Sequence, residues 1–452
     1  MTAASIRPFR INVYGHVCGD YSTPIMRLSR EQADASQKSV LGIPGLERGK
    51  LMTTQQLAER GLTIADVCKQ NGWETAKLGF SKGGPAASAA LAAFQLASNQ
   101  GSVHFYGAAG KDHIAERLGQ YLDRYNLPHT LTAVRNAHTS HTLVVNEQVE
   151  GDADAQRTFI HEPGANAEVE IFPESVLQVL ENTRNIFMVG GSFLMPKFHP
   201  QGVLRMFQHV KEQAAHMREA DVITILNTVH DPSGNWDLGE NAAGLIDVLI
   251  MDLDEAKGIA GMDVSEMNMP ALFEWFKNSG FRNIVVTNGV KGAYMHSTDD
   301  NVFVPTPQHL AMHIPASRYV MGLDRPKYGL GCGDVTAGAL AVAIGEHMDL
   351  VSAGSFAMSA GGACALVEPG EIGGPCKQGG QRIREGKGSQ PTTFEQVLAK
   401  MADQFDPGPR IMAPYIKDVD YEMMAKTALD QAAEAQLPEA PETAPESTEE
   451  QA

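Results

Sequence analysis

Short apolar runs alternate with longer stretches of helical periodicity along much of the chain. The runs are rich in Val, Ile and Phe, and helix-period stretches such as residues 83–98 and 200–220 separate them. Strands that alternate with helices of this length indicate parallel β-α-β units, because a helix must carry the chain back across a parallel sheet. The sequence therefore predicts an α/β fold with a doubly wound, mostly parallel sheet, whose strands we expect at residues 10–15, 102–107, 185–191, 221–227, 247–252 and 283–289.

Several of these runs end in glycine or in a small polar residue. In an open parallel sheet, ligands bind outside the carboxyl ends of the strands. The residues at those ends are therefore candidates for the rim of a binding crevice: Gly15, Gly107, Gly190, Asn227, Asp252 and Asn288.

Other segments do not fit this alternation. Residues 21–60 are mixed and polar, and residues 137–166 alternate between apolar and polar positions, which is typical of exposed β-structure. We expect both to form a small β lid within a domain spanning residues 1–390. Residues 391–432 have the pattern of added helices. Residues 433–452 are rich in Pro, Glu, Ala, Ser and Thr, a composition that cannot bury a core, and we expect a disordered acidic tail there.

Charge and composition exclude some classes of function. The formal net charge is −18, which argues against a nucleic-acid partner because phosphate binding needs a basic patch. No run of about 18 apolar residues is present, so we expect no membrane span. The first residues lack the apolar core of a signal peptide, and the five cysteines show no metal-ligand spacing. These features predict a cytoplasmic protein with reduced cysteines.

Residues 329–334, Gly-Leu-Gly-Cys-Gly-Asp, place three glycines around one aspartate, and a helical pattern follows. This puts Gly331, Cys332 and Gly333 at a helix N-terminus, where unpaired N–H groups favour an anion. Asp334 is then either the cap of the helix, a position that aspartate favours, or a catalytic base. On this stretch alone, both interpretations stay open.

Two further strand ends carry candidate chemistry. Asp252 ends a predicted strand and Glu255 lies one helical turn later. Their carboxylates suit Mg²⁺, which prefers oxygen ligands, but acidic residues are also common at helix starts. Gly289 and Gly292 follow another strand, where they either line a nucleotide or form a hairpin turn, and the turn is favoured in isolation.

Several common signatures are missing from the sequence. It contains no GxxxxGK[ST] loop for phosphates, no GxGxxG after the first strand and no GxSxG elbow. The 15 histidines show no HExxH or other paired metal-ligand spacing. A P-loop enzyme, a Rossmann-type oxidoreductase and an α/β-hydrolase are therefore not expected.

The order of the remaining stretches resembles the ribokinase-like (PfkB) carbohydrate kinases, of which the chain is identified as a divergent member. Residues 11–22 resemble that family's first strand with its substrate-binding aspartate. Residues 83–98 resemble its Gly-Gly signature, and residues 329–340 resemble its Gly-Ala-Gly-Asp signature. Residues 157–169, 225–236, 247–261 and 285–295 match further motifs in collinear order. The resemblance covers about residues 8–375 and implies a three-layer α/β/α domain that transfers phosphate from ATP to a sugar hydroxyl.

The resemblance also implies roles for individual residues. Asp334 would accept the hydroxyl proton, and the N–H groups of Gly331, Cys332 and Gly333 would stabilise the developing charge. The substrate-binding residues that it implies are Asp20, Gly83, Gly84, Ser88 and Asn166. The ATP-binding residues are Asn227, Thr287, Gly289 and Gly292, and the Mg²⁺ ligands are Glu255 and Asp252.

The sequence departs from the family pattern at several positions. Tyr328 and Gly329 stand where the family has an Asp-Thr pair that helps to hold a monovalent cation, so activation by K⁺ is not implied. Ser88 replaces an asparagine and reaches less far. Asp252 also replaces an asparagine and adds negative charge near the phosphates. Residues 311–327 are additional sequence on the nucleotide side.

Two other functions stay open. Residues 46–56 resemble the lid of adenosine-kinase-like members, which favours a nucleoside as the phosphate acceptor. The departures at residues 328–329 favour a protein that has kept the kinase fold only for binding or scaffolding. In either kinase the partner is a small molecule, and an exposed β lid offers a surface for a homodimer.

Overall fold

The computed structural model of the chain describes residues 7–97, 100–150, 155–263, 269–289, 292–297, 301–305, 331–348 and 350–364. These residues belong to one compact unit, residues 1–412. The helices expected at 391–432, the tail at 433–452, the additional sequence at 311–327, and Tyr328 and Gly329 lie outside the described residues.

The larger of two sheets in the described residues has nine strands in the order β15-β14-β13-β12-β11-β10-β1-β6-β7. Neighbouring strands from β13 to β7 are parallel, and the β13–β14 and β14–β15 pairs are antiparallel. This confirms the expected mostly parallel α/β sheet. Its strands are β1 (Phe9–Gly15), β6 (Gly101–Ala109), β7 (His129–Ala133), β10 (Arg184–Gly190), β11 (Asp221–Asn227), β12 (Val248–Asp252), β13 (Ile284–Thr287), β14 (Gly292–His296) and β15 (Asn301–Pro305).

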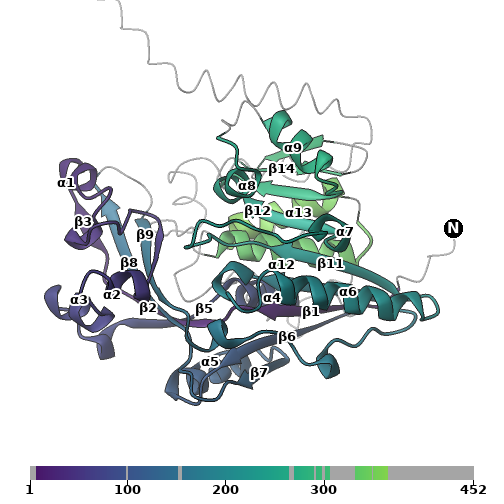
Figure 1. Cartoon of the computed structure of the whole chain (residues 1–452), viewed down its shortest axis with the longest axis horizontal. Coiled ribbons are helices and arrows are strands. Elements are labelled where there is room, and N and C mark those ends of the chain that lie inside the picture. Colours follow the sequence, from purple (N-terminus) through teal and green to yellow (C-terminus); the bar gives the residue numbers. More distant parts are fainter. Residues whose placement is uncertain are drawn as a thin grey trace, which may run out of the picture. The chain divides into compact units, whose positions relative to one another are not determined.

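Helices cover both faces of this sheet (Figure 1), so the three-layer arrangement is confirmed. One hydrophobic core lies under α4 (Pro85–Leu96), α5 (His113–Arg124), α12 (Cys332–Gly345) and α13 (Leu350–Cys364). The other lies under α6 (Gln201–Ala215), α7 (Ala242–Leu245), α8 (Leu253–Ala260) and α9 (Met269–Asn278).

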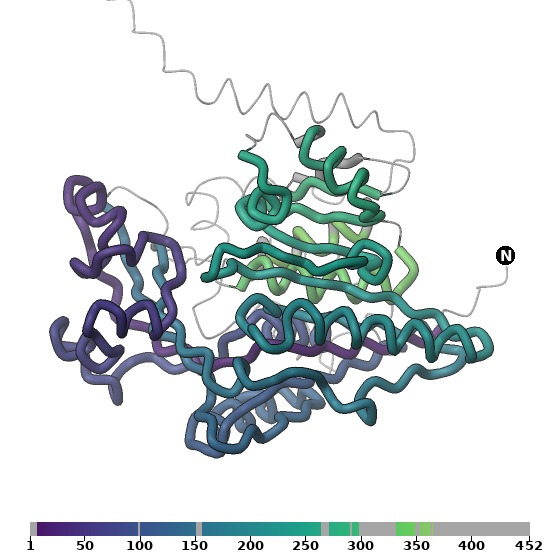
Figure 2. The backbone as a smooth tube through the Cα atoms, in the orientation of Figure 1, coloured from purple at the N-terminus to yellow at the C-terminus, as the bar shows by residue number. Residues whose placement is uncertain are grey.

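Strand β1 lies in the middle of the sheet, between β6 and β10. Figure 2 shows its purple tube running beside segments from later in the chain. Ile11 and Val13 enter one core, and Tyr14 enters the other. Burial on both faces explains why this strand reads as a nearly continuous apolar run.

Helices α4 and α12 pack backbone against backbone. A Cβ atom at Gly338 of α12 would lie 2.2 Å from the carbonyl oxygen of Ala89 on α4, so only glycine fits there. Both helices begin at the edge of the sheet where the parallel strands end. Gly84, at the start of α4, touches Val17, which lies just beyond the end of β1. Gly345, at the end of α12, touches Phe9 at the start of β1, so α12 begins at the same edge as α4. Small residues therefore bring the starts of these two helices to one edge.

The second sheet forms the β lid and has the order β4-β9-β8-β2-β5, with β3 paired to β8. Its strands are β2 (Cys18–Ser22), β3 (Met26–Leu28), β4 (Leu51–Thr53), β5 (Gly79–Gly83), β8 (His141–Val149) and β9 (Ala155–Glu162). With them lie α1 (Arg30–Ala35), α2 (Thr54–Ala58), α3 (Ile64–Gln70), η1 (Val40–Gly42) and η2 (Thr75–Lys77). The described chain also contains η3 (Gly164–Glu168), η4 (Glu174–Val176) and η5 (Ser192–Leu194).

The expectation of exposed β-structure at residues 137–166 is wrong for β8. Most of this strand is buried, because Leu143 and Val145 pack into a separate lid core with residues such as Val40, Leu57 and Val67. The segment that looked polar in the sequence thus supplies the cover for this strand.

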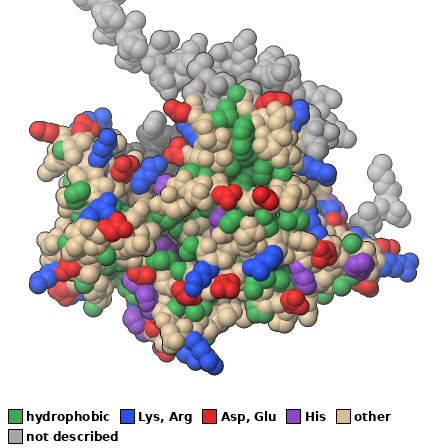
Figure 3. Space-filling model, in the orientation of Figure 1, with side chains coloured by type: hydrophobic (Ala, Val, Ile, Leu, Met, Phe, Trp, Pro, Cys, Tyr) green, Lys and Arg blue, Asp and Glu red, His purple; other side chains and the backbone are tan. Residues whose placement is uncertain are grey.

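The surface of the described residues mixes both signs of charge. On the face shown in Figure 3, Lys and Arg side chains are interspersed with Asp and Glu. No helix in the described part of the chain is both long and apolar enough to cross a bilayer.

Candidate active site

Asp334 lies in the first turn of α12, but it is not the cap of that helix. Gly331 occupies the cap position with a φ of 75°, and it makes no side-chain cap bond. The interpretation of Asp334 as a cap is therefore wrong. Instead, Nδ2 of Asn227, at the end of β11, donates a hydrogen bond to Oδ1 of Asp334 at 3.3 Å. The carboxylate thus joins a strand end to the helix start that also holds Cys332.

The environment of Asp334 gives it the properties of a base near neutral pH. Burial raises the pKa of Asp334 to about 6, while the Lys82 ammonium and the hydrogen bond from Asn227 oppose the rise. A carboxylate with a pKa near the working pH is well suited to accept and release a proton.

Lys82 is a site residue that the sequence did not reveal. Its side chain lies on β5, is fully buried, and donates from Nζ to Oγ of Ser88 at 2.7 Å. Burial lowers the pKa of Lys82, and the nearby carboxylates of Asp334 and Asp20 oppose that effect. One buried cation therefore acts on both candidate carboxylates, and it also donates to the hydroxyl of Ser88, a predicted substrate-binding residue.

Asp20 lies on β2 in the lid sheet and is only 6% exposed. Burial raises its pKa to about 6, whereas the Cys18 hydrogen bond and the Lys82 ammonium lower it. Gly83 of β5 pairs with Cys18, and a Cβ atom at Gly83 would come within 2.3 Å of the Asp20 carboxylate. Gly84 has a φ of +95° and caps α4, with the His16 carbonyl 2.5 Å from where its Cβ would be. At both positions a neighbouring group lies so close that there is no room for a side chain, and only glycine fits.

Asn166 lies on η3 and is fully buried. Its Nδ2 donates to the carbonyl of Val17 at 2.8 Å. This bond ties the lid-proximal segment to the chain just after β1. The structure thus gives Asn166 a bracing contact, and its predicted contact with substrate stays a prediction.

The predicted metal pair forms the start of α8. Asp252 accepts from the backbone N–H of Glu255 at 2.8 Å, and Glu255 Oε2 accepts from the N–H of Asp252 at 3.0 Å. Thr228, just after β11, also donates to Oε2 at 2.7 Å. The two acidic residues therefore make a reciprocal helix cap, which does not by itself exclude metal binding because Oε1 of Glu255 takes no part in these bonds.

Glu255 is a buried carboxyl group close to two other acidic side chains. Burial, together with the nearby charges of Asp252 and Asp334, raises its pKa to about 8. Carboxylate oxygens are the ligands that Mg²⁺ prefers, and it commonly keeps several waters. The donor set therefore fits Mg²⁺, although the described residues contain no group of three or more His, Cys, Asp and Glu placed to hold a metal.

Of the predicted nucleotide glycines, Gly289 lies between β13 and β14, and Gly292 is the first residue of β14. The strands are antiparallel, with Thr287 opposite Ala293, and the N–H of Asn288 donates to the carbonyl of Gly292 at 2.8 Å. Gly289 has a φ of +53°. The hairpin turn favoured from the sequence is therefore present, and the hydroxyl of Thr287 contacts the carbonyl of Met251 at 3.4 Å.

Arg157 of β9 is a second basic residue that the sequence did not reveal. It is 8% exposed, and its charge lowers the pKa of both Asp20 and Cys332, so it lies near each of them. The alternation of β9 gives no sign that an arginine faces inward. The site thus brings together Asp20 and Arg157 from the lid sheet and Asp334 from the large domain.

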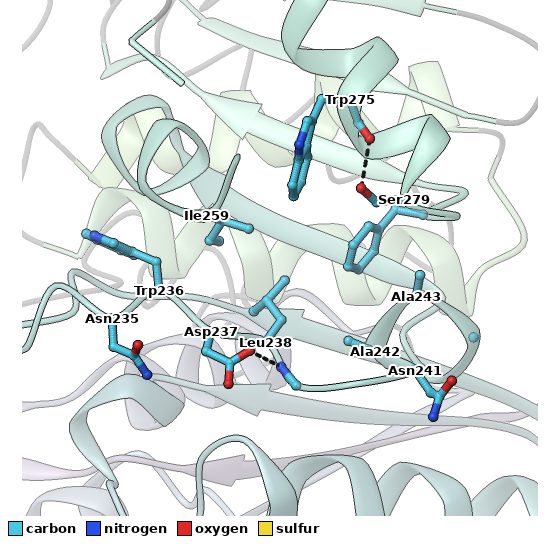
Figure 4. Close-up of a pocket in the computed structure, with 13 residues that line it drawn as sticks. Asn235, Trp236, Asp237, Leu238, Asn241, Ala242, Ala243, Ile259, Trp275 and Ser279 are labelled. Atoms are coloured by element: carbon cyan, nitrogen blue, oxygen red, sulfur yellow. Dashed lines mark hydrogen bonds between the residues drawn. The ribbon is translucent and has the colours of Figure 1, made fainter. Parts of the chain in front are cut away.

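A separate pocket of about 690 Å³ lies over the opposite helix layer, and no predicted site residue lines it. Figure 4 shows Trp236 and Trp275 at two of its sides, with Leu238 and Ile259 between them. Its other lining residues are Asn235, Asp237, Gly239, Asn241, Ala242, Ala243, Gly244, Ser279 and Phe281. It is therefore distinct from the site around Asp334.

Solved kinase structures resemble the chain in fold. A probable sugar kinase from Rhizobium etli has a TM-score of 0.57 at 14% identity, covering 83% of this chain and 99% of that one. An adenosine kinase from Sinorhizobium meliloti has a TM-score of 0.58 at 13% identity, covering 82% and 99%. The ribokinase of Arabidopsis thaliana, complexed with ribose and ATP, has a TM-score of 0.55 at 18% identity, covering 83% and 98%. At these identities the similarity establishes the fold.

Sequence comparison identifies the family directly. No curated protein matches the chain significantly. The model of the pfkB family carbohydrate kinases matches residues 50–312, which is more than half of the chain. Together with the fold, this match shows that the chain belongs to the pfkB family of carbohydrate kinases.

Proposed function

We propose that the protein transfers the γ-phosphoryl group of ATP to a hydroxyl of a sugar, with Asp334 as the general base. The observation that carries this proposal is the placement of Asp334 in the first turn of α12, hydrogen-bonded to Asn227 and facing the charge of Lys82. The N–H groups of Gly331, Cys332 and Gly333 lie at the same helix start, where a developing negative charge is stabilised.

Asp20 is proposed to bind the acceptor on the lid side. Its carboxylate and that of Asp334 both act on the ammonium of Lys82, so the two lie near one buried cation. A sugar hydroxyl that bonds to Asp20 would hold another hydroxyl of the same ring toward Asp334. Fixing the acceptor in this way supplies much of the rate enhancement of phosphoryl transfer.

Mg²⁺ is proposed to be held at Glu255 and Asp252, mainly through water and the phosphates of ATP. When bound, it supplies positive charge that neutralises the phosphates during transfer. The residues of the chain contribute the buried carboxylate of Glu255 and the hydroxyl of Thr228 that orients it. Thr287, Gly289 and Gly292 are proposed to lie along the nucleotide.

Asp334→Asn tests the proposed base. We expect kcat to fall by about 10²–10⁴-fold, with little change in the KM of the acceptor, because asparagine keeps the shape but cannot take the proton. The wild type is first offered a panel of sugars and nucleosides with Mg-ATP, since a nucleoside acceptor would point to the adenosine-kinase-like alternative. Unchanged melting temperatures show that the variant is folded.

Two outcomes would contradict the proposal. If no member of the panel is phosphorylated and none stabilises the protein against heat, a binding or scaffolding role replaces the kinase. If Asp334→Asn turns over as fast as the wild type, another group is the base. Size-exclusion measurements on the same samples test the expected homodimer.

A further inference from the structure

A chain of buried polar side chains leads from the end of β1 to Asp20. Nε2 of His16 lies 3.3 Å from Nε2 of His161 on β9, and Nδ1 of His161 lies 3.0 Å from the hydroxyl of Thr142 on β8. That hydroxyl lies 3.6 Å from Sγ of Cys18, which lies 3.3 Å from Oδ1 of Asp20. All five residues are at most 6% exposed, so they satisfy one another rather than bulk water.

The two histidines of this hydrogen-bonded series, His16 and His161, each carry a single ring proton at neutral pH. Burial lowers the pKa of His161 to about 4, and burial lowers that of His16 well below its ordinary value. A neutral imidazole has one N–H donor and one bare nitrogen. The donor and the acceptor of every hydrogen bond in this series are therefore known once the position of one proton is known.

Ser140 fixes that first proton. Its hydroxyl donates to the carbonyl of Glu162 at 2.9 Å, so its oxygen can only accept from Nε2 of His16 at 3.4 Å. His16 therefore carries its proton on Nε2 and also donates to Nε2 of His161. The proton of His161 then lies on Nδ1 and is donated to Thr142, whose own hydrogen points toward Cys18 and Asp20.

The reverse direction is unfavourable. It would place the proton of His16 on Nδ1, and this atom has no hydrogen-bond partner in the described part of the chain. A buried N–H without an acceptor costs more than a bare nitrogen in the same position. In the favoured direction every hydrogen of the chain is used, and the last is the Cys18 thiol on Asp20.

We propose that His16, His161, Thr142 and Cys18 form a positioning relay, which ends in the hydrogen bond from Cys18 to Oδ1 of Asp20 and so leaves Oδ2 to accept a hydrogen bond from a hydroxyl of the phosphate acceptor. The proposal rests on the proposed function, because it assigns Asp20 to acceptor binding. It also explains why Asp20 stays an acceptor in a buried place: the hydrogen bonds from Cys18 and Thr142 lower its pKa against the effect of burial.

The relay links the lid to the large domain. His16 directly follows β1 of the large sheet, whereas the three other members lie on β9, β8 and β2 of the lid sheet. The orientation of the Asp20 carboxylate therefore depends on the contact between the two sheets. The relay residues touch no proposed reacting atom, and they act through Asp20.

Thr142→Val tests the relay because it removes the one hydroxyl in the middle of the chain while nearly keeping the volume. With the acceptor found in the panel, we expect KM to rise about tenfold, the factor that corresponds to about 1.4 kcal/mol, with kcat within about twofold of the wild type. Thr142→Ser keeps the hydroxyl and should restore the wild-type KM. Thr158→Val is the matched control, since Thr158 is a fully buried threonine of β9 whose hydroxyl bonds to Gly49 outside the relay.

Two measurements need no acceptor. ¹⁵N spectra of the imidazoles should show protons on Nε2 of His16 and Nδ1 of His161 in the wild type. ¹³C titration of labelled aspartate should show a higher pKa for Asp20 in Thr142→Val than in the wild type or Thr158→Val, because a hydrogen bond to the carboxylate is lost. The wild-type spectrum alone remains decisive if Thr142→Val does not fold.

The outcomes separate this inference from the proposed function. An unchanged KM in Thr142→Val, or a proton on Nε2 of His161 in the wild type, would overturn the relay while leaving the kinase intact. If the wild type accepts no sugar or nucleoside, the proposed function fails. The imidazole spectra and the Asp20 titration then still decide whether the relay orients that carboxylate.

Discussion

Glu255→Gln isolates the electrical charge of the proposed Mg²⁺ site from its hydrogen bonds. In the wild type, Oε2 of Glu255 accepts from the hydroxyl of Thr228 and from the backbone N–H of Asp252. The amide oxygen of glutamine can accept both bonds. The substitution therefore keeps the start of α8 and removes only the buried negative charge.

The expected magnitude follows from the pKa of Glu255. Burial raises it from the ordinary value of 4.5 to about 8. Between these values the folded protein binds more protons at this group than the unfolded chain, so stability falls as pH rises from 4.5 to 8. One pKa unit corresponds to about 1.36 kcal/mol, which sets an upper limit of about 5 kcal/mol on the loss. Because the charge of Asp252 acts on Glu255, part of this loss belongs to Asp252, and we expect about 2–3 kcal/mol from Glu255 alone.

The assay compares the melting temperatures of the wild type and Glu255→Gln from pH 5 to pH 9 in the presence of a chelator. The two proteins should melt together at pH 5, and the glutamine variant should melt several degrees higher above pH 8. Adding Mg²⁺ at pH 8 should stabilise the wild type but not the variant. Glu59→Gln, which removes an exposed charge at the end of α2, should show neither effect.

Parallel melting curves for the wild type and Glu255→Gln across this pH range would refute the reasoning. They would mean that the carboxyl of Glu255 is as well solvated in the folded protein as in the unfolded chain. Equal stabilisation of both proteins by Mg²⁺ would place the metal elsewhere.

Two further substitutions test the rest of the site. Lys82→Met should raise the pKa of Asp334 above about 6, because the ammonium no longer opposes the effect of burial. The acid limb of the pH–rate profile should then move to a pH higher by about one unit or more. An acid limb at the wild-type pH would mean that the ammonium does not act on the base. Gly84→Ala should cost about 3 kcal/mol of stability, from its φ of +95° and the His16 carbonyl 2.5 Å from the new Cβ. Gly61→Ala, with a φ of +72° and open space around it, should cost only about 1 kcal/mol, and equal losses of melting temperature would contradict the close approach.

The strands of the large sheet are predictable because helices bury them on both faces. The runs expected at residues 10–15 and 221–227 correspond to β1 and β11 within one residue. Such strands are apolar almost throughout, and the signal survives without knowledge of what covers them. The order of the helices between them then fixes the doubly wound arrangement.

The lid was less predictable because its burial depends on distant parts of the chain. The alternation at residues 137–166 correctly indicates β-structure at β8 and β9, but it suggests an exposed face. The cover comes from about a hundred residues earlier, where Val40, Leu57 and Val67 are spread over a polar-looking segment. No local pattern shows that these residues meet β8.

The site shows the same division. The spacing of Asp252 and Glu255 is enough to suggest a helix start, and the helix cap is present. The burial of Glu255 and its bond to Thr228 depend on β11 and β12 being neighbours. The burial of Lys82 is harder to predict, because lysine is ordinarily exposed and the small residues beside it in the sequence do not indicate a buried position. Its role arises only where the two sheets meet.

The glycine contact between α4 and α12 has a consequence for how the site can change. Because Gly338 lies against the backbone of Ala89, no side chain separates the two helices at this point. Gly84 and Gly331 are the residues at which these two helices start. A side chain at position 338 would force the two helices apart, and would so change the spacing between Gly84 at the start of α4 and Asp334 in the first turn of α12.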